Sequence, residues 1–109
     1  MGLNEKTYDL AKSITSTREF INLKNAKKDI DEIGELKDRV KIFTNKQMQL
    51  FKCNNHKEAE KMVKEINSEY KNLSNIPEVK RFFQAGKVFN SMMSNIYKYV
   101  SSSLDSFLE

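Results

Sequence analysis

Residues 77–108 decide the fold, with the sequence PEVKRFFQAGKVFNSMMSNIYKYVSSSLDSFL. Apolar residues recur in this stretch at alternating spacings of three and four, and polar side chains occupy most positions between them. The recurring positions are Val79, Phe82, Gly86, Phe89, Met93, Ile96, Val100, Leu104 and Phe107. The pattern predicts one amphipathic helix of about 32 residues, which would be about 48 Å long at 1.5 Å per residue. A compact domain of this size has a radius of gyration of only about 13 Å, so we expect the helix to overrun its own domain or to pair with another chain.

The first 34 residues predict two shorter helices. The first runs from about residue 4 to residue 15. Ser16-Thr17-Arg18-Glu19 then matches a capping box, in which the Ser16 hydroxyl and the Glu19 carboxylate each satisfy a backbone N–H. Gly34 follows the second helix as a candidate left-handed C-cap. The same pattern also fits a single helix that bends at Ser16.

Two further helices fill the middle of the chain. The three-four rhythm restarts at Glu35 and stops at the polar stretch 52–55, after which Asn55 and Glu58 are placed to cap a fourth helix. Pro77 follows a short connection and suits the first position of the long helix, where its missing N–H costs nothing. Such short connections favour antiparallel neighbours. The sequence therefore predicts a single all-α domain over residues 1–109, an antiparallel helical bundle of four to five helices with a long C-terminal helix.

The composition excludes several classes of protein. Charged residues make up 31% and hydrophobic residues 39% of the chain, with only three glycines and one proline, which is typical of exposed helices that each carry one apolar stripe. No run approaches the roughly 18 apolar residues of a membrane span, and no secretory leader is visible. We therefore expect a cytoplasmic protein.

The net charge of +4 invites a nucleic-acid hypothesis. Acidic and basic residues alternate between residues 57 and 71, however, as they do on a solvated helix face. We keep a direct nucleic-acid-binding module as the alternative function. Its candidate contacts are Lys27, Lys28, Lys37, Arg39 and Lys41.

Cys53 and His56 are the residues with the clearest metal-ligand chemistry, in the spacing C-x-x-H. A tetrahedral site needs four ligands, and this chain has one cysteine and one histidine. Two facing chains could complete a Cys2His2 set, but we favour an incidental loop pair as the explanation of the spacing. No catalytic, cofactor-binding or metal-binding residue is assigned, so we expect a protein that is not an enzyme and has no cofactor of its own.

The second half of the long helix has apolar residues on more than one stripe, and a helix that is apolar on two sides needs two partners. The chain itself can cover one side, and a second copy of the chain is the simplest cover for the other. Met93 and its neighbours also fit a role in the core of the chain. We nevertheless expect a homodimer and assign the interaction surface to Phe83, Met92, Met93, Ile96, Tyr97, Val100 and Leu104.

The sequence resembles a known family over nearly its whole length. In the first third the resemblance lies in Tyr8-Asp9-Leu10-Ala11 and in Ser16-Thr17-Arg18-Glu19-Phe20. Farther along it lies in His56-Lys57-Glu58-Ala59, Met62-Val63-Lys64-Glu65-Ile66 and Ile76-Pro77-Glu78-Val79-Lys80-Arg81-Phe82. These segments are similar to the YlbF/YmcA family of small bacterial helical proteins, and more to its YmcA branch at the Ile76-Pro77 junction.

The resemblance implies a regulatory protein without catalytic activity. Family members act in multiprotein complexes that support competence, sporulation and biofilm development and that steer messenger-RNA processing by ribonuclease Y, so contact with RNA would be indirect. Some members hold iron–sulfur clusters within such a complex, using cysteines that include ones beyond the last helix. This sequence ends at Glu109 on that helix and has only Cys53, so we do not expect it to hold a cluster alone.

We predict that the isolated protein is colourless and holds no stoichiometric iron or zinc, because one cysteine and one histidine per chain cannot close a four-ligand site. Metal analysis of anaerobically purified protein tests this. Roughly half an equivalent of metal per chain, lost in Cys53→Ser, would show instead that two chains share a site.

Overall fold

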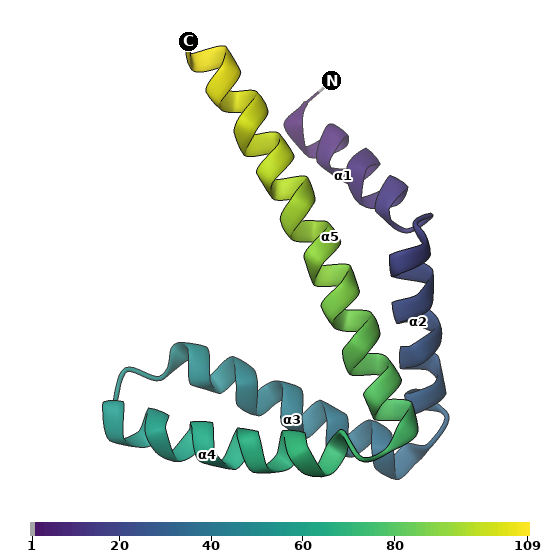
Figure 1. The fold of residues 1–109 in the computed structure, drawn as a ribbon, viewed down its shortest axis with the longest axis vertical. Helices are drawn as coiled ribbons and strands as arrows, with labels where there is room; N and C mark the ends of the chain where they lie inside the picture. Colours follow the sequence, from purple (N-terminus) through teal and green to yellow (C-terminus); the bar gives the residue numbers. More distant parts are fainter. Residues whose placement is uncertain (1) are drawn as a thin grey trace. The chain divides into compact units, whose positions relative to one another are not determined.

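The computed structural model describes residues 2–109 and shows five α-helices and no strand among them (Figure 1). In chain order they are α1 (Leu3–Ile14), α2 (Arg18–Asp31), α3 (Gly34–Lys52), α4 (His56–Leu73) and α5 (Pro77–Leu108). The last of these is 32 residues long. The predicted all-α fold with a long C-terminal helix is confirmed.

Two of the predicted helix starts are confirmed. The Asn55 side chain caps α4, because its Oδ1 accepts hydrogen bonds from the backbone N–H groups of Lys57 (3.0 Å) and Glu58 (3.2 Å). Pro77 is the first residue of α5, after a turn at residues 74–76. At that position its ring breaks no helical hydrogen bond.

Two predictions about the ends of α2 were wrong: its N-cap residue and the role of Gly34. A turn separates α1 from α2, and the cap is Thr17 rather than Ser16: the Thr17 hydroxyl accepts a hydrogen bond from the backbone N–H of Phe20 at 3.2 Å. Gly34 is not a left-handed C-cap, since no described glycine has a positive φ and Gly34 begins α3. The chain instead leaves α2 through a tight turn, in which Ile33 N–H donates to the carbonyl of Ile30 at 3.0 Å.

The described chain forms two compact units. The hairpin unit comprises Ala26–Phe83, with the end of α2, all of α3 and α4, and the start of α5. The terminal unit comprises residues 2–25 and 84–109, with α1, the start of α2 and most of α5. Each unit is considered separately below.

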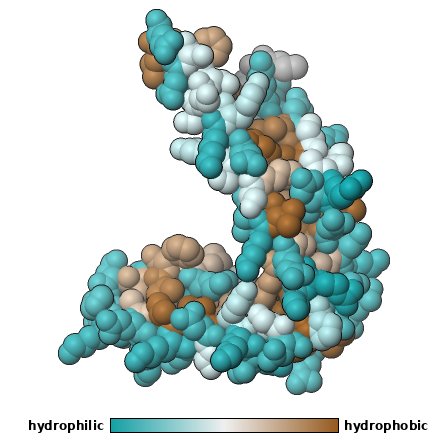
Figure 2. Space-filling model, viewed as in Figure 1, coloured by the Kyte–Doolittle hydropathy of each residue, from teal (hydrophilic) through white to brown (hydrophobic). Residues whose placement is uncertain are grey.

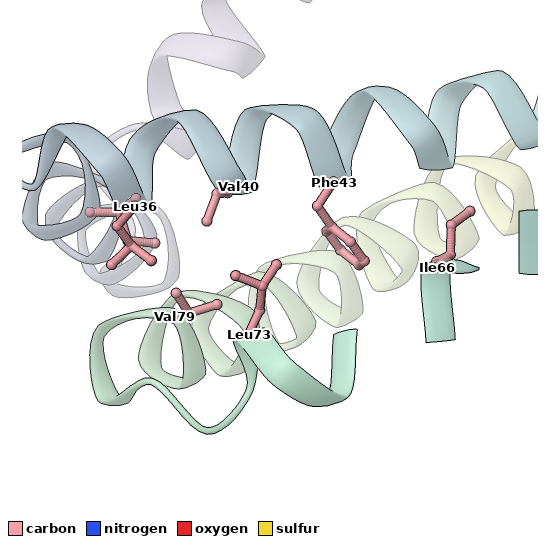
Figure 3. Close-up of a cluster of buried hydrophobic side chains, with 7 residues drawn as sticks. Leu36, Val40, Phe43, Ile66, Leu73 and Val79 are labelled. Atoms are coloured by element: carbon pink, nitrogen blue, oxygen red, sulfur yellow. The ribbon is translucent and has the colours of Figure 1, made fainter. Parts of the chain in front are cut away.

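The hairpin unit contains the hydrophobic core (Figure 3). Ile30 of α2, Leu73 of α4 and Val79 of α5 are fully buried, with no exposed surface. They pack with four further buried side chains, Leu36, Val40, Phe43 and Ile66. Helices α3 and α4 lie side by side and run in opposite directions (Figure 1), as their short connection predicts.

Aromatic rings and one ion pair join the helices of this unit. The Tyr70 ring stacks on Phe83, with centroids 5.1 Å apart and planes 11° from parallel, and Phe43 lies 5.6 Å from Phe83. Arg39 of α3 reaches Glu69 of α4 at 3.4 Å, between half-exposed side chains. That ion pair stabilises the hairpin little, because solvent screens it. Apolar burial therefore supplies most of the stability of this unit.

The terminal unit has a different character. None of its described residues is buried, and α1 has no buried residue along its whole length. Its packing rests on half-buried side chains such as Phe20 of α2 and Phe89 of α5, whose rings lie 6.0 Å apart. An isolated helix as short as α1 is only marginally stable in water, so α1 depends on the half-buried contacts of this unit.

We predict that Leu73→Ala lowers the free energy of unfolding by about 2–5 kcal/mol, because it leaves a cavity in a fully buried site. Val63→Ala, on the same helix, is the matched control: Val63 is 40% exposed. We expect that control to cost about 1 kcal/mol or less. Urea unfolding followed by circular dichroism measures both, and equal losses in the two variants would contradict this account of the core.

Candidate functional site

The second half of α5 presents apolar side chains to solvent. Tyr97 is 74% exposed and Leu104 is 58% exposed, although both belong to the largest helix of the protein. Other large apolar side chains on this part of α5 are also exposed: Met93, Tyr99, Val100, Phe107 and Leu108. Single exposed apolar residues are common, whereas a group of them on one helix is a candidate interaction surface.

The same segment carries almost no charge. Between residues 88 and 104 only Lys98 is charged, whereas 31% of the whole chain is charged. Serine, asparagine and tyrosine fill much of the segment, and these residues favour a helix less than alanine, leucine or lysine do. One of them, Ser103, donates from its hydroxyl to the carbonyl of Tyr99 at 2.9 Å. Packing rather than intrinsic propensity must therefore hold this part of α5 as a helix.

Helix α1 adds apolar surface to the terminal unit. Leu3 is 80% exposed, and Tyr8 and Leu10 are also exposed. Leu3 and Leu10 are seven residues apart and project to nearly the same side of α1, whereas Tyr8 lies off that side. No residue of α1 was predicted for the interaction surface.

The seven residues predicted for the interaction surface lie in two different units of the structure. Six of them lie on α5 within the terminal unit, where Met93, Tyr97, Val100 and Leu104 are exposed and Met92 and Ile96 are half-buried. Phe83 lies in the hairpin unit, half-buried and packed in the aromatic group with Phe43 and Tyr70. Tyr99, Phe107 and Leu108 are exposed on α5 but were not assigned. We call the six residues of the terminal unit, together with Tyr99, the α5 surface.

The residues proposed for direct nucleic-acid contact do not form one uniform basic group. Lys27 pairs with Asp31 at 2.6 Å, and Arg39 pairs with Glu69 at 3.4 Å. Lys28, Lys37 and Lys41 are exposed. The two ion pairs reduce the positive charge that this set offers to phosphates.

Cys53 and His56 make contacts with different neighbours. The Cys53 thiol donates to the backbone carbonyl of Asn55 at 3.4 Å, and His56 Nε2 lies 3.1 Å from a carboxylate oxygen of Glu60. Residues 2–109 include no group of three or more histidine, cysteine, aspartate or glutamate side chains placed to hold a metal ion. None of the helices that these residues form is long and apolar enough to cross a bilayer.

The chain is all-helical, with a small core and a charge-poor surface on α5 that presents apolar side chains. The chain belongs to the YlbF/YmcA family: the family model described as "Control of competence regulator ComK, YlbF/YmcA" matches residues 3–105, across both units.

A solved structure has a similar fold. The X-ray crystal structure of Bacillus subtilis RicA in complex with RicF contains a chain that superimposes with a TM-score of 0.64 at 15% sequence identity. The match covers 98% of this chain and 96% of that one. No curated protein matches the sequence.

Proposed function

We propose that this protein is a non-catalytic regulatory subunit that acts by binding other proteins through the α5 surface. The observation that carries the proposal is the terminal unit, which has no buried residue among those described yet presents a group of large apolar side chains. Each such side chain that a partner buries fully gains about 1.5–3 kcal/mol. Membership of a family of competence regulators, and a similar fold in a protein solved as a complex, support the same function.

Membership of the family supports a proposal for the biological role. We propose that the protein works in a cytoplasmic multiprotein complex that supports competence, sporulation or biofilm development and that steers messenger-RNA processing by ribonuclease Y. RNA would then be reached through the partner proteins. The ion pairs of Lys27 and Arg39 favour this function over direct nucleic-acid binding.

The simplest partner for the α5 surface is a second copy of the chain. A two-fold axis would place the charge-poor half of α5 against the same segment of its mate. Such a contact would bury Met93, Ile96, Val100 and Leu104 without desolvating a carboxylate, because the segment from residue 88 to residue 104 contains none. Another protein of the regulatory complex could bind the α5 surface in place of the second copy.

We predict that Ile96→Asp with Val100→Asp converts a dimer into a monomer, because the contact would then have to bury unpaired charges. Sedimentation velocity at micromolar concentration measures the change. The matched control is Ser91→Asp with Ser102→Asp, which adds the same charge at exposed positions on the opposite side of α5. This control should remain a dimer. A wild-type protein that sediments as a monomer with α5 folded would contradict the homodimer.

The partner-binding function has its own test. Affinity capture from the source cell, followed by mass spectrometry, should recover regulatory proteins with the wild-type chain and lose them with the variant at positions 96 and 100. The control at positions 91 and 102 should retain them. Recovery of RNA without partner proteins would favour direct nucleic-acid binding instead, if that RNA is lost both in high salt and after ribonuclease treatment.

A further inference from the structure

The α3–α4 hairpin separates charges that alternate along the sequence. Successive side chains of a helix are about 100° apart, so residues seven positions apart project to nearly the same side. Glu58, Glu65 and Glu69 consequently share one side of α4. Their place in the fold is fixed by contacts: Glu69 faces Arg39 of α3, and Glu58 and Glu65 line a shallow hollow with Lys46. We call this the acidic side of the hairpin after its three glutamates, which lie there beside three basic residues, Arg39, Lys46 and Lys61.

The opposite side of the hairpin is rich in lysine. Tyr70 defines this side, because its ring lies against Phe43 and Phe83 while Glu69 faces Arg39. Helical geometry places five lysines toward the two outer edges of this side: Lys37, Lys41 and Lys52 on α3, and Lys64 and Lys71 on α4. All five are exposed, and the four ion pairs found among residues 2–109 involve none of them. Glu60 is the one carboxylate near this side, and it contacts His56.

An apolar strip runs between the lysines. It consists of Met48 and Phe51 of α3 and Val63 and Tyr70 of α4, all of them exposed, and Phe51 is 91% exposed. Figure 2 shows hydrophobic side chains gathered on the hairpin, with hydrophilic side chains along its edge. Together with the lysines at its edge, this surface extends along α3 from Lys41 to Lys52, a length of about 16 Å at 1.5 Å per residue. That length matches about three turns of an incoming helix.

We propose that the lysine side of the hairpin binds an acidic amphipathic helix of a partner protein. The apolar face of such a helix would cover Phe51, Val63 and Tyr70, and its carboxylates would meet lysines along both edges. This surface lies within the hairpin unit and is separate from the α5 surface. The protein would therefore have two binding surfaces of different chemistry, one charge-poor and one basic.

The strip favours a peptide over a nucleic acid. A single-stranded nucleic acid needs several free aromatic faces on which successive bases stack. Tyr70 is already stacked on Phe83 at 5.1 Å, which leaves Phe51 as the one strongly exposed ring of the strip. Arginine, the residue best suited to bidentate phosphate contacts, is absent from this side.

Fluorescence anisotropy with a labelled synthetic peptide tests the proposal. The probe is a helix of about twelve residues with leucine and phenylalanine at three-four spacing and glutamate elsewhere, and the comparison peptide has glutamine in place of glutamate. The glutamate peptide should bind, with an affinity that falls as salt is added, and the glutamine peptide should bind about tenfold more weakly.

Lys41→Glu with Lys71→Glu should weaken binding of the glutamate peptide by about tenfold or more. The matched control, Lys46→Glu with Lys61→Glu, makes the same change of charge on the acidic side and should leave the affinity unchanged. Phe51→Ser keeps every lysine and should also weaken binding. Circular dichroism confirms that each variant is folded.

Several results would overturn the proposal. They are no binding of the glutamate peptide, an equal loss in the variant at positions 46 and 61, and tighter binding of a single-stranded RNA oligonucleotide that is lost in the variant at positions 41 and 71. Dissociation of a wild-type dimer by that same variant would place a second copy on this side instead. The peptide and RNA results do not bear on the α5 surface, whereas loss of the dimer in this variant would also argue against a dimer formed through α5. The variant at positions 96 and 100 tests the α5 surface separately.

Discussion

The meeting of three helices at Ile30, Leu73 and Val79 is the contact on which the hairpin unit depends. These side chains come from α2, α4 and α5, and none of them has any exposed surface. Val79 can join the cluster because α5 begins at Pro77, so that its first turn brings Val79 directly to Leu73 and Ile30. Because these side chains are fully buried against one another, a core of only seven residues can stabilise the hairpin unit.

Beyond residue 84, the apolar side chains of α5 are far more exposed than those of its first turns. The apolar side chains of its first turns, Val79, Phe82 and Phe83, are buried or half-buried. Its later turns have exposed apolar side chains, and only one residue between positions 88 and 104 is charged. A helix of this composition gains little from intrinsic propensity and little from intrachain packing. The proposed association with another chain would remove this cost, which gives a physical reason for the protein to act within a complex.

Much of the fold was predictable from the sequence. The three-four spacing of apolar residues predicted the helices, Asn55 and Pro77 predicted two of their starts, and Val79 was placed on the apolar stripe of the long helix. The wrong details were local: Thr17 rather than Ser16 caps α2, and Gly34 begins a helix. Ser16 and Thr17 are neighbours, and either hydroxyl residue can adopt the backbone geometry of an N-cap. The spacing in the sequence therefore could not show which of the two caps α2.

The surfaces were less predictable, for a different reason. Periodicity identified the apolar stripe of α5 but could not say which of its residues the chain itself covers, and Phe83 proved to pack within the hairpin unit. The charges between residues 57 and 71 alternate in sequence, and only the pairing of α3 with α4 separates them into an acidic side and a lysine side. Which residues share a surface of the hairpin depends on how α3 packs against α4, and the periodicity of a single helix does not contain it.

The central claim is that a second chain completes the terminal unit, and hydrogen exchange over a range of protein concentrations tests it most directly. Amide protection in residues 88–104 should rise with concentration, because association adds to the stability of this segment. Protection of the core around Ile30, Leu73 and Val79 should change far less. Equal and high protection of residues 88–104 at all concentrations, in a protein that sediments as a monomer, would contradict the account.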